Sequence, residues 1–332
     1  MKVLSKNLTA LNILLFSCLF GAFAQTKVIF DTDFGGDADD LGALCILHHF
    51  IDTKECDLLA VMVWSQEKYA VPAIDAVNKF YGHNEIPIGV RKGTPFYEAW
   101  NYCKPIADSF PSELDFNTAA DATVLYRQLL AKADDHSIVI VPVGPLANIQ
   151  NLINSPADDL SPLTGKELIH QKVKEFVVMG GQFPSGENEW NFNGNMPGVT
   201  KFVFDNIDVP VILSGFEVGA AIKTGEVFNK IDHQTPLYVG FMHFSKNASW
   251  INQDFKGKIL NNSTFDQTAV MYAVRKNTKN CWELVNGGVC IPDEKGGNTW
   301  ETIPNSNHSY LKLIKDPQEM ATYIESLMLH NE

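Results

Sequence analysis

Short apolar runs alternate along this chain with longer stretches that are apolar on one side only. The runs at 28–30, 58–63, 86–90, 138–143, 176–179 and 209–213 are largely apolar throughout. Continuous apolar runs are typical of strands that are buried on both faces of a parallel sheet. Amphipathic stretches with helical spacing lie between them, at 71–81, 118–133 and 196–204. The alternation predicts an α/β fold, an open, mainly parallel sheet with helices on both faces.

Polar and glycine-containing segments follow the predicted strands at their carboxyl ends. The first strand is followed by five aspartates within ten residues, and further segments of this kind stand at 64–66, 143–145, 179–181 and 214–217. Ligands of parallel α/β sheets bind at the carboxyl ends of the strands. We therefore expect these loops to converge on one edge of the sheet.

Two later regions complete the predicted domain. Residues 222–263 are predicted to form lid insertions of helices and loops over that edge, where Trp250 and His243 are available to close it. Residues 280–300, rich in Gly and Asn, predict turns and short strands, and residues 317–329 predict a closing helix. The chain has no low-complexity linker, so residues 25–332 are predicted to form a single domain.

The five aspartates that follow the first predicted strand form the most informative cluster of the chain: Asp31, Asp33, Asp37, Asp39 and Asp40. Carboxylates brought together in one loop repel each other unless a cation or a proton neutralises them. Oxygen ligands with no neighbouring Cys or His favour Ca²⁺ or Mg²⁺. The alternative is a solvated acidic loop that caps the following helix, although a cap requires only one Asp.

Two other acidic-loop chemistries fit this segment less well. An EF-hand loop that begins at Asp31 would have Gly42 at its twelfth position, where a Glu is needed, and the segment before it predicts a strand rather than a helix. An aspartyl phosphotransferase could also begin with Asp31-Thr32-Asp33, but this three-residue pattern is common on its own.

The first 24 residues have the features of a secretory signal peptide. Lys2 and Lys6 precede an apolar stretch at 11–20, and Ala22-Phe23-Ala24 stands before Gln25. We expect cleavage there and export of the mature chain to the periplasm or the cell exterior. Because the leader carries two lysines and no acid, its removal moves the net charge from −13 to −15. An acidic surface argues against nucleic acid polymers and anionic membranes as partners, and no later segment predicts a membrane span.

Five cysteines remain after residue 24, and an odd number excludes a complete disulfide framework. Cys281 and Cys290 flank Asn286-Gly287-Gly288, which we interpret as a hairpin turn. In an exported protein the two cysteines could form a disulfide bond, and two buried free thiols are the alternative.

Five segments, taken in order, resemble the motifs of the inosine–uridine-type nucleoside hydrolases, and the chain looks like a divergent exported member of that family. The segments are 31–44 (DTDFGGDADDLGAL), 141–148 (VPVGPLAN), 178–181 (VMGG), 189–191 (EWN) and 265–270 (FDQTAV). The resemblance spans about residues 27–275. It implies the same open parallel sheet, one bound Ca²⁺, and hydrolysis of the N-glycosidic bond of a ribonucleoside or related ribosyl compound to a base and ribose.

The resemblance also implies a metal site and a general base. Asp33, Asp40 and Asp266 would be carboxylate ligands of the calcium ion, and Val143 would supply its backbone carbonyl. Asp33 would in addition take a proton from the attacking water. The transition state of glycoside hydrolysis resembles an oxocarbenium ion, so the surrounding carboxylates would stabilise it. Without the family context, Asp266 could simply cap the helix at 267–275.

Substrate contacts follow from the same resemblance. Asp37 or Asp39 would hold the ribose 2′-hydroxyl. Glu189 and Asn191 would hold the 5′ and 3′ side of the sugar, and Trp190 could lie against the base. On their own, residues 189–191 could equally form a surface turn.

The sugar side of the motifs departs from the family pattern in two places. The acidic loop has two more residues between Asp33 and the Asp39-Asp40 pair than the best-known members have, which leaves open whether Asp37 or Asp39 meets the ribose. Ser65-Gln66 stands where many members carry Gly-Asn, and Asn188 is the nearest candidate for the contact with the 5′-hydroxyl.

A third departure affects the leaving base. Phe265 stands where the family commonly has a His that protonates a purine leaving group. Either another residue donates the proton, with His243, Tyr238 and His233 in the lid as candidates, or the base leaves without one.

Three functional hypotheses remain open. The leading one is an exported, Ca²⁺-dependent N-ribohydrolase acting on a small-molecule nucleoside or ribosyl compound. The second is a nucleoside- or sugar-binding protein that kept the metal pocket but lost turnover through Phe265. The third is a hydrolase of another glycosyl compound, such as nicotinamide riboside. The family often forms dimers or tetramers, so a homo-oligomer is compatible with the resemblance.

Overall fold

The computed structural model describes residues 25–93, 101–277, 279–304 and 306–331. The predicted signal peptide lies outside these residues. None of the helices in the described ranges is both long and apolar enough to cross a membrane.

The described residues form an open sheet of eleven strands in the order β4-β3-β2-β1-β5-β6-β8-β13-β11-β12-β7. From β4 to β13 every neighbouring pair is parallel, and the last three strands add an antiparallel extension. In chain order the strands are β1 (Thr26–Thr32), β2 (Cys56–Val63), β3 (Ile88–Val90), β4 (Ala120–Asp121), β5 (Ile138–Pro142), β6 (Val173–Met179), β7 (Ser185–Gly186), β8 (Val211–Ser214), β11 (Trp282–Pro292), β12 (Asn298–Thr302) and β13 (His308–Leu313). The predicted α/β class and mainly parallel sheet are confirmed.

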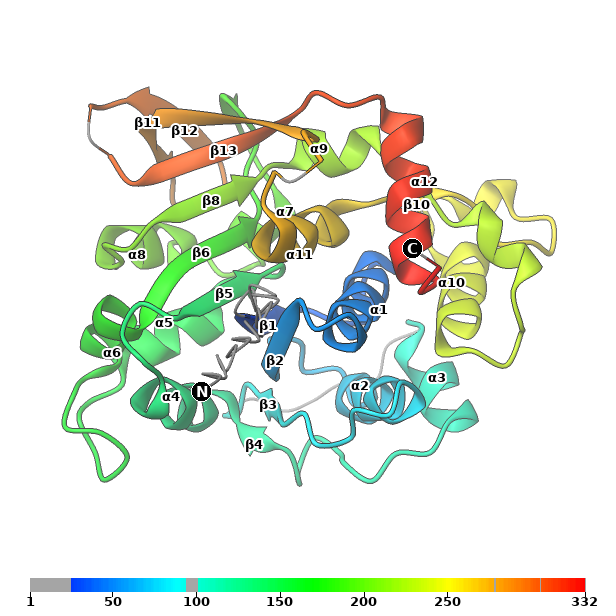
Figure 1. Ribbon diagram of the computed structural model, residues 1–332, viewed down its shortest axis with the longest axis horizontal. Helices are drawn as coiled ribbons and strands as arrows, with labels where there is room; N and C mark the ends of the chain where they lie inside the picture. Colours follow the sequence, from blue (N-terminus) through cyan, green and yellow to red (C-terminus); the bar gives the residue numbers. More distant parts are fainter. Residues whose placement is uncertain (1–24, 94–100, 278, 305, 332) are drawn as a thin grey trace, which may run out of the picture.

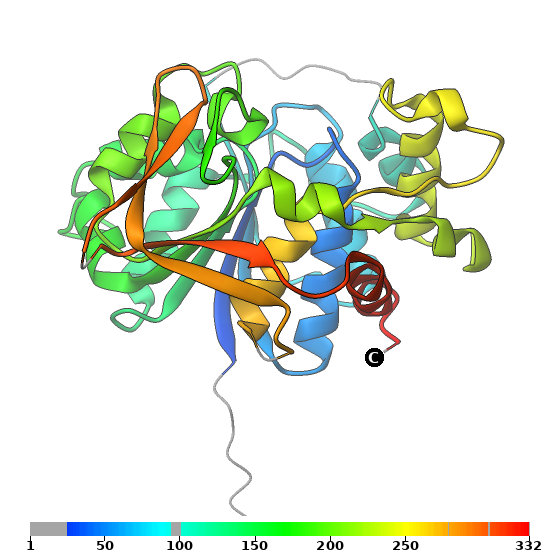
Figure 2. The same cartoon turned by 90° about the horizontal axis from the view of Figure 1, so that it is seen from above.

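Helices cover both faces of this sheet (Figure 1, Figure 2). Alternate residues of β1 belong to opposite cores: Val28 and Phe30 face one and Ile29 the other, as the two-residue period of a strand requires. The first core packs against α1 (Asp39–Asp52), α2 (Ala70–Phe80), α3 (Cys103–Ser109), α10 (Pro236–Asn247), α11 (Phe265–Arg275) and α12 (Pro317–Met328). The second packs against α4 (Ala122–Lys132), α5 (Ala147–Asn154), α6 (Gly165–Lys172) and α8 (Val199–Asn206).

The chain changes direction across the sheet between β1 and β5. From β1 it builds outward through β2, β3 and β4, and it then returns to place β5 on the other side of β1. Such a switch point leaves a crevice at the strand carboxyl ends, because the connections on its two sides leave in opposite directions. The segments that follow β1 and β5 are the acidic loop and Val143, so the topology places both at this crevice.

The predicted elements agree with the structure at their centres and differ at some ends. The helix predicted at 118–133 begins only at Ala122, because the Asp121 side chain accepts hydrogen bonds from the backbone N–H groups of Thr123 and Val124 and so caps it. The helix predicted at 196–204 begins after Gly198, whose φ is 78°. The lid is confirmed as helices and loops: besides α10 it has the 3₁₀ helices η1 (Glu226–Lys230) and η2 (Asn252–Asp254), and β9 (Lys223–Thr224) pairs with β10 (Asn262–Ser263).

The hairpin turn predicted at 286–288 was wrong, although a turn does follow at 293–297, where β11 is joined to the short antiparallel strand β12. Residues 282–292 form one long strand, β11, and Gly287 sits with φ 78° at an irregularity in its pairing with β13. Cys281 and Cys290 are therefore nine positions apart along nearly extended chain, about 30 Å, far beyond the reach of a disulfide. Both are free and buried, as are the other cysteines of the described residues.

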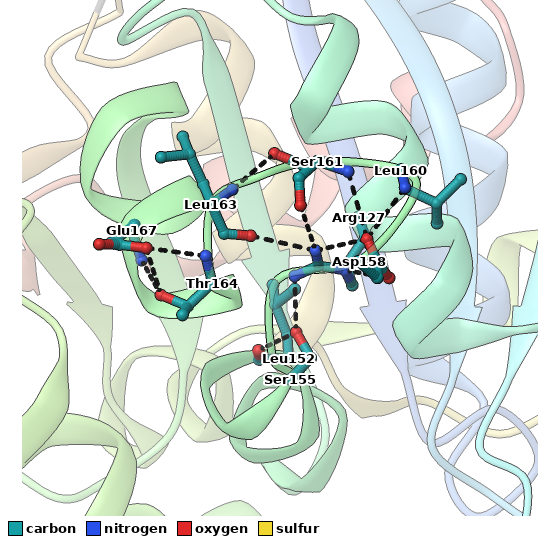
Figure 3. Close-up of polar contacts among 9 residues, drawn as sticks. All are labelled: Arg127, Leu152, Ser155, Asp158, Leu160, Ser161, Leu163, Thr164 and Glu167. Carbon is teal, nitrogen blue, oxygen red and sulfur yellow. Dashed lines mark hydrogen bonds and ion pairs between the residues drawn. The ribbon is translucent and has the colours of Figure 1, made fainter.

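A buried arginine fixes the connection between α5 and α6. The side chain of Arg127, on α4, is only 2% exposed, and its guanidinium bonds both carboxylate oxygens of Asp158 at 2.9 and 2.7 Å. It also donates to the carbonyl oxygens of Ser161 and Leu163 and to Ser155 Oγ (Figure 3). These bonds are the main polar anchor of this loop against α4.

Replacing Arg127 by Met should lower the free energy of unfolding by about 2 kcal/mol or more, because the carbonyl of Leu163 would lose its donor and the Asp158 carboxylate would lose its guanidinium partner. Urea denaturation measures this change. Lys201→Met is the matched control, since Lys201 forms an exposed ion pair with Asp205 one helical turn away. A loss no larger than that of the control would show that Arg127 does not anchor the loop.

Candidate active site

A cavity of about 560 Å³ opens at the carboxyl ends of the central strands. Segments that follow β1, β2, β5, β6 and β8 all contribute to its lining, which confirms that the five loops converge. The lining includes every residue that the motifs single out: Asp33, Asp37, Asp39, Asp40, Val143, Glu189, Trp190, Asn191 and Asp266.

Three carboxylates in this cavity lie close enough to share one metal ion. Asp39, Asp40 and Asp266 each offer an oxygen within 4.8 Å of the other two, and all three are buried. The backbone N–H of Asp266 donates to Asp39 Oδ2 at 3.4 Å across a sequence separation of 227 residues. Asp266 lies in the first turn of α11, whose N-cap is Thr264, so its carboxylate is not used as a helix cap.

Hydrogen bonds hold the acidic side chains in place. Thr32 Oγ1 donates to Asp40 Oδ1, and the indole N–H of Trp190 donates to Asp33 Oδ2 at 2.9 Å. Asp37 Oδ1 accepts from Asn262 Nδ2 at 2.5 Å, which ties the acidic loop to β10 in the lid. The side chain of Asp37 is therefore turned toward the lid, whereas Asp39 lies beside Asp40 and Asp266.

Burial raises the pKa of every aspartate in this cluster. The pKa of Asp33 rises to about 6 and that of Asp37 to about 7, in both cases mainly through burial. Burial and the neighbouring carboxylates hold the pKa values of Asp39, Asp40 and Asp266 well above the ordinary range. Groups in this state either take up protons or bind a cation, and a buried set of carboxylate oxygens is the donor set of a hard divalent ion.

Val143 lines the same cavity, and its backbone carbonyl is an acceptor. The Asn191 side-chain amide donates to this carbonyl at 2.8 Å and to the carbonyl of Met179 at 3.1 Å. Asn191 thus joins the ends of β5 and β6. A carbonyl oxygen has two lone pairs, so Val143 keeps one free for a ligand.

Gly144 allows Asp33 to lie against the end of β5. A Cβ atom at residue 144 would stand 2.8 Å from the backbone nitrogen of Asp33 and 2.9 Å from its Cβ. No side chain fits in that space without moving Asp33. The glycine that follows Val143 therefore sets the position of the first aspartate of the site.

Glu189 shapes the loop that follows β6. Its carboxylate accepts from the backbone N–H groups of Gly181, Asn191 and Phe192 at 3.0–3.1 Å and caps the short helix α7 (Trp190–Asn193). Burial raises its pKa to about 7 although these hydrogen bonds oppose the rise. Glu189 and Asn191 are thus buried at the start of α7, and their substrate contacts remain predictions.

One wall of the cavity is aromatic. Trp190, Phe216 and Trp250 line it with exposed fractions of 52%, 42% and 51%, and Phe265 stacks on Phe216 with ring centroids 5.1 Å apart. Of the lid residues considered as proton donors, His243, Tyr238 and His233 are not part of the described lining. The ring of His233 instead stacks on Tyr238 at 3.9 Å.

Some residues of the cavity lining lie outside the sequence motifs, so the motifs did not identify them as site residues. Asn101 and Gln182 stand outside every resembling segment, and Phe216 was marked only by its place after a predicted strand. Among the residues named for the departures from the family pattern on the sugar side, Ser65 and Asn188 line the cavity. Gln66 is not one of the lining residues.

The fold and this cavity define a class of protein, an α/β enzyme with a carboxylate site for a metal ion at the switch point of its sheet. The chain belongs to the inosine-uridine preferring nucleoside hydrolase family, whose family model matches residues 28–320. It is accordingly a nucleoside hydrolase-like enzyme that acts on N-glycosyl compounds. A comparison with curated protein sequences gives no match.

Solved structures share the fold at low sequence identity. A plant nucleoside hydrolase (PpNRh1) is 16% identical with a TM-score of 0.66, over 91% of this chain and 98% of its own. A purine-preferring ribonucleoside hydrolase from Gardnerella vaginalis is 15% identical with a TM-score of 0.63, over 92% and 97%. The type III effector protein XopQ, complexed with adenosine diphosphate ribose, is 11% identical with a TM-score of 0.61, over 93% of each chain.

The raised pKa values predict how stability depends on pH. Asp31 and Glu189, each with a pKa raised to about 7, bind protons in the folded state at pH 5.5 that they release on unfolding, and so do Asp39, Asp40 and Asp266. Their contribution is present at low pH and is lost as pH rises through the folded pKa. The lowered pKa values of the buried His48 and His308 act in the opposite direction but belong to fewer groups. The melting temperature of the EDTA-treated protein should therefore fall by roughly 5 °C or more between pH 5.5 and pH 8.

Differential scanning fluorimetry measures this slope. Millimolar CaCl₂ should raise the melting temperature at pH 8 more than at pH 5.5, because at pH 5.5 protons compete for the same oxygens. Asp40→Asn should flatten the slope of the EDTA-treated protein. A melting temperature that rises with pH in EDTA would contradict the raised pKa values of these carboxyl groups.

Proposed function

We propose that this enzyme is a calcium-dependent N-ribohydrolase, which hydrolyses the N-glycosidic bond of a ribonucleoside or related ribosyl compound to a base and ribose. One observation carries the proposal: Asp39 and Asp40 from the first loop and Asp266 from α11 converge in the cavity that Asp33 also lines. Distant parts of the chain assemble a buried oxygen site, which a solvated acidic loop would not require.

The donor set fits Ca²⁺. Asp33, Asp40 and Asp266 would provide carboxylates and Val143 a carbonyl, and Asp39 lies beside them. Hard oxygen donors with space for water and two ribose hydroxyls match the six to eight ligands that Ca²⁺ takes. When bound, the ion would lower the pKa of a coordinated water and orient the ribose hydroxyls.

Asp33 acts as general base. The indole N–H of Trp190 donates to Asp33 Oδ2 and holds the carboxylate at the cavity, where it would take the proton of the attacking water. As the C1′–N bond breaks, positive charge develops on the sugar, and the buried carboxylates stabilise it more than they stabilise the neutral ground state.

We assign the ribose 2′-hydroxyl to Asp39 rather than Asp37. The carboxylate of Asp37 is tied to the lid through Asn262, whereas Asp39 lies beside Asp40 and Asp266. A ribose that binds next to the ion would meet Asp39 first. Glu189 then holds the loop that borders the 5′ side, and the Trp190 ring lies against the base.

A second candidate is a binding protein without turnover. The stacked pair Phe216 and Phe265 stands where a proton donor for the leaving base would be expected, which favours this alternative for bases that need a proton. Calorimetry that shows nucleoside binding, together with no ribose release over hours, would support it.

Asp33→Ala should reduce ribose release by about 10³-fold or more, because the water loses its base and the site loses a carboxylate. A reducing-sugar assay measures the loss, and EDTA should cause a similar one that CaCl₂ restores. Asp57→Asn, at an exposed position of β2, is the matched control and should keep the wild-type rate. An Asp33→Ala protein with wild-type turnover would refute the mechanism.

Export remains a prediction. We propose that the chain is cleaved before Gln25 and acts in the periplasm or outside the cell. Mass spectrometry of the protein from the periplasmic or secreted fraction should give a mature chain that begins at Gln25, and an intact leader in a cytoplasmic fraction would contradict it.

A further inference from the structure

The charged residues of the described cavity lining all have the same sign. Six carboxylates line it: Asp33, Asp37, Asp39, Asp40, Glu189 and Asp266. A bound divalent ion carries two positive charges, fewer than the number of carboxylates. Arg91 stacks its guanidinium on the ring of Trp64, 5.0 Å from the centroid, but is not itself one of the lining residues. An ionised site of this kind attracts cations and repels phosphorylated ligands.

Aromatic side chains form part of the wall beside these carboxylates. Trp190, Phe216 and Trp250 are each about half exposed and line the same cavity. Aromatic faces attract cations, and the attraction increases when water is excluded. The indole N–H of Trp190 bonds Asp33 Oδ2, which fixes one of these rings directly beside the carboxylate assigned as general base.

Phe265 also favours a cationic ligand, because of the chemistry of the leaving group. Its ring stacks on Phe216 in the aromatic wall of the cavity, and a phenyl ring cannot donate a proton. A neutral purine leaves more easily when it is protonated. An aglycone that already carries a positive charge becomes neutral as the bond breaks and needs no acid.

We propose that the preferred substrates are ribosides whose aglycone carries a permanent positive charge, namely N-ribosylpyridinium compounds and N7-alkylated purine ribosides. The inference rests on the proposed ribohydrolase function. The oxygen of water bonds to C1′, and the C1′–N electron pair moves to the ring nitrogen and cancels its charge. One water proton passes to Asp33 and then to solvent. The products are ribose, a neutral base and one H⁺.

A substrate panel separates this inference from the proposed function. It contains nicotinamide riboside and 7-methylguanosine as cations, guanosine, inosine and uridine as neutral compounds, and nicotinamide mononucleotide as a phosphorylated cation. Each kcat/KM is divided by the uncatalysed hydrolysis rate of the same compound, which removes intrinsic reactivity. We expect 7-methylguanosine to exceed guanosine at least tenfold in this ratio, and nicotinamide riboside to exceed its mononucleotide by a similar factor.

The outcomes are distinct. Neutral nucleosides cleaved as well as or better than the cations would overturn the inference while supporting the ribohydrolase function. Release of ribose from no compound, with or without calcium, would overturn both.

A binding measurement avoids turnover altogether. 1-Methylnicotinamide and nicotinamide have nearly the same shape and differ in charge, so competition of each against the active riboside compares charge alone. The cation should bind at least tenfold more tightly, with an affinity that falls as salt rises. Equal affinities would overturn the proposal.

Phe265→His tests the role of the missing acid. A histidine among these carboxylates would be protonated and could serve a neutral base, so the kcat/KM of guanosine relative to that of 7-methylguanosine should rise about tenfold or more. Phe265→Leu is the matched control, because it removes the ring without adding a proton donor, and should not raise the ratio. A ratio that Phe265→His leaves unchanged, in a variant that retains wild-type melting temperature, would count against the proposal.

Discussion

Repulsion among buried carboxylates is the constraint on which this site depends. Asp39, Asp40 and Asp266 lie within a few ångströms of one another, and among the described residues Asp39 accepts a hydrogen bond from the backbone N–H of Asp266 and Asp40 accepts one from Thr32 Oγ1. Single bonds cannot offset several negative charges in a region of low dielectric, so the cluster must take up protons or bind a cation. The same property makes the cluster costly to the fold without a cation and well suited to a transition state that gains positive charge.

The topology of the sheet explains why such a cluster can form at all. The switch point between β1 and β5 leaves an opening at the strand ends, and the acidic loop and Val143 leave the sheet on its two sides. Close approach across this opening requires the absence of a side chain at Gly144, which would otherwise meet the backbone of Asp33. Asn191 then joins β5 to β6 through two carbonyls, so the loop that carries the substrate motif is attached to the strands that carry the metal site.

Much of the fold could be predicted from the local pattern of apolar residues. The site could be predicted from the order of the motifs along the chain. Continuously apolar strands identified the parallel sheet because both faces are covered, and their carboxyl ends located the cavity. The pattern failed at β11, where Gly287 and Gly288 indicate a turn but instead form an irregularity within a strand, so that two cysteines that seemed able to pair lie far apart. Asn101 and Gln182 could not have been identified, because their place in the lining depends on tertiary packing alone.

The two halves of the cavity meet within a single turn of α11. Phe265 and Asp266 are consecutive, and consecutive residues of a helix point about 100° apart, so one side chain joins the aromatic wall and the other joins the carboxylates. Under the proposed function, residue 265 could therefore change the chemistry offered to the base while residue 266 keeps its place beside Asp39 and Asp40. In that mechanism the arrangement would separate the choice of leaving group from the carboxylates that act on the bond. It accounts for a chain whose metal-site motif agrees with its family while the residue beside that motif does not.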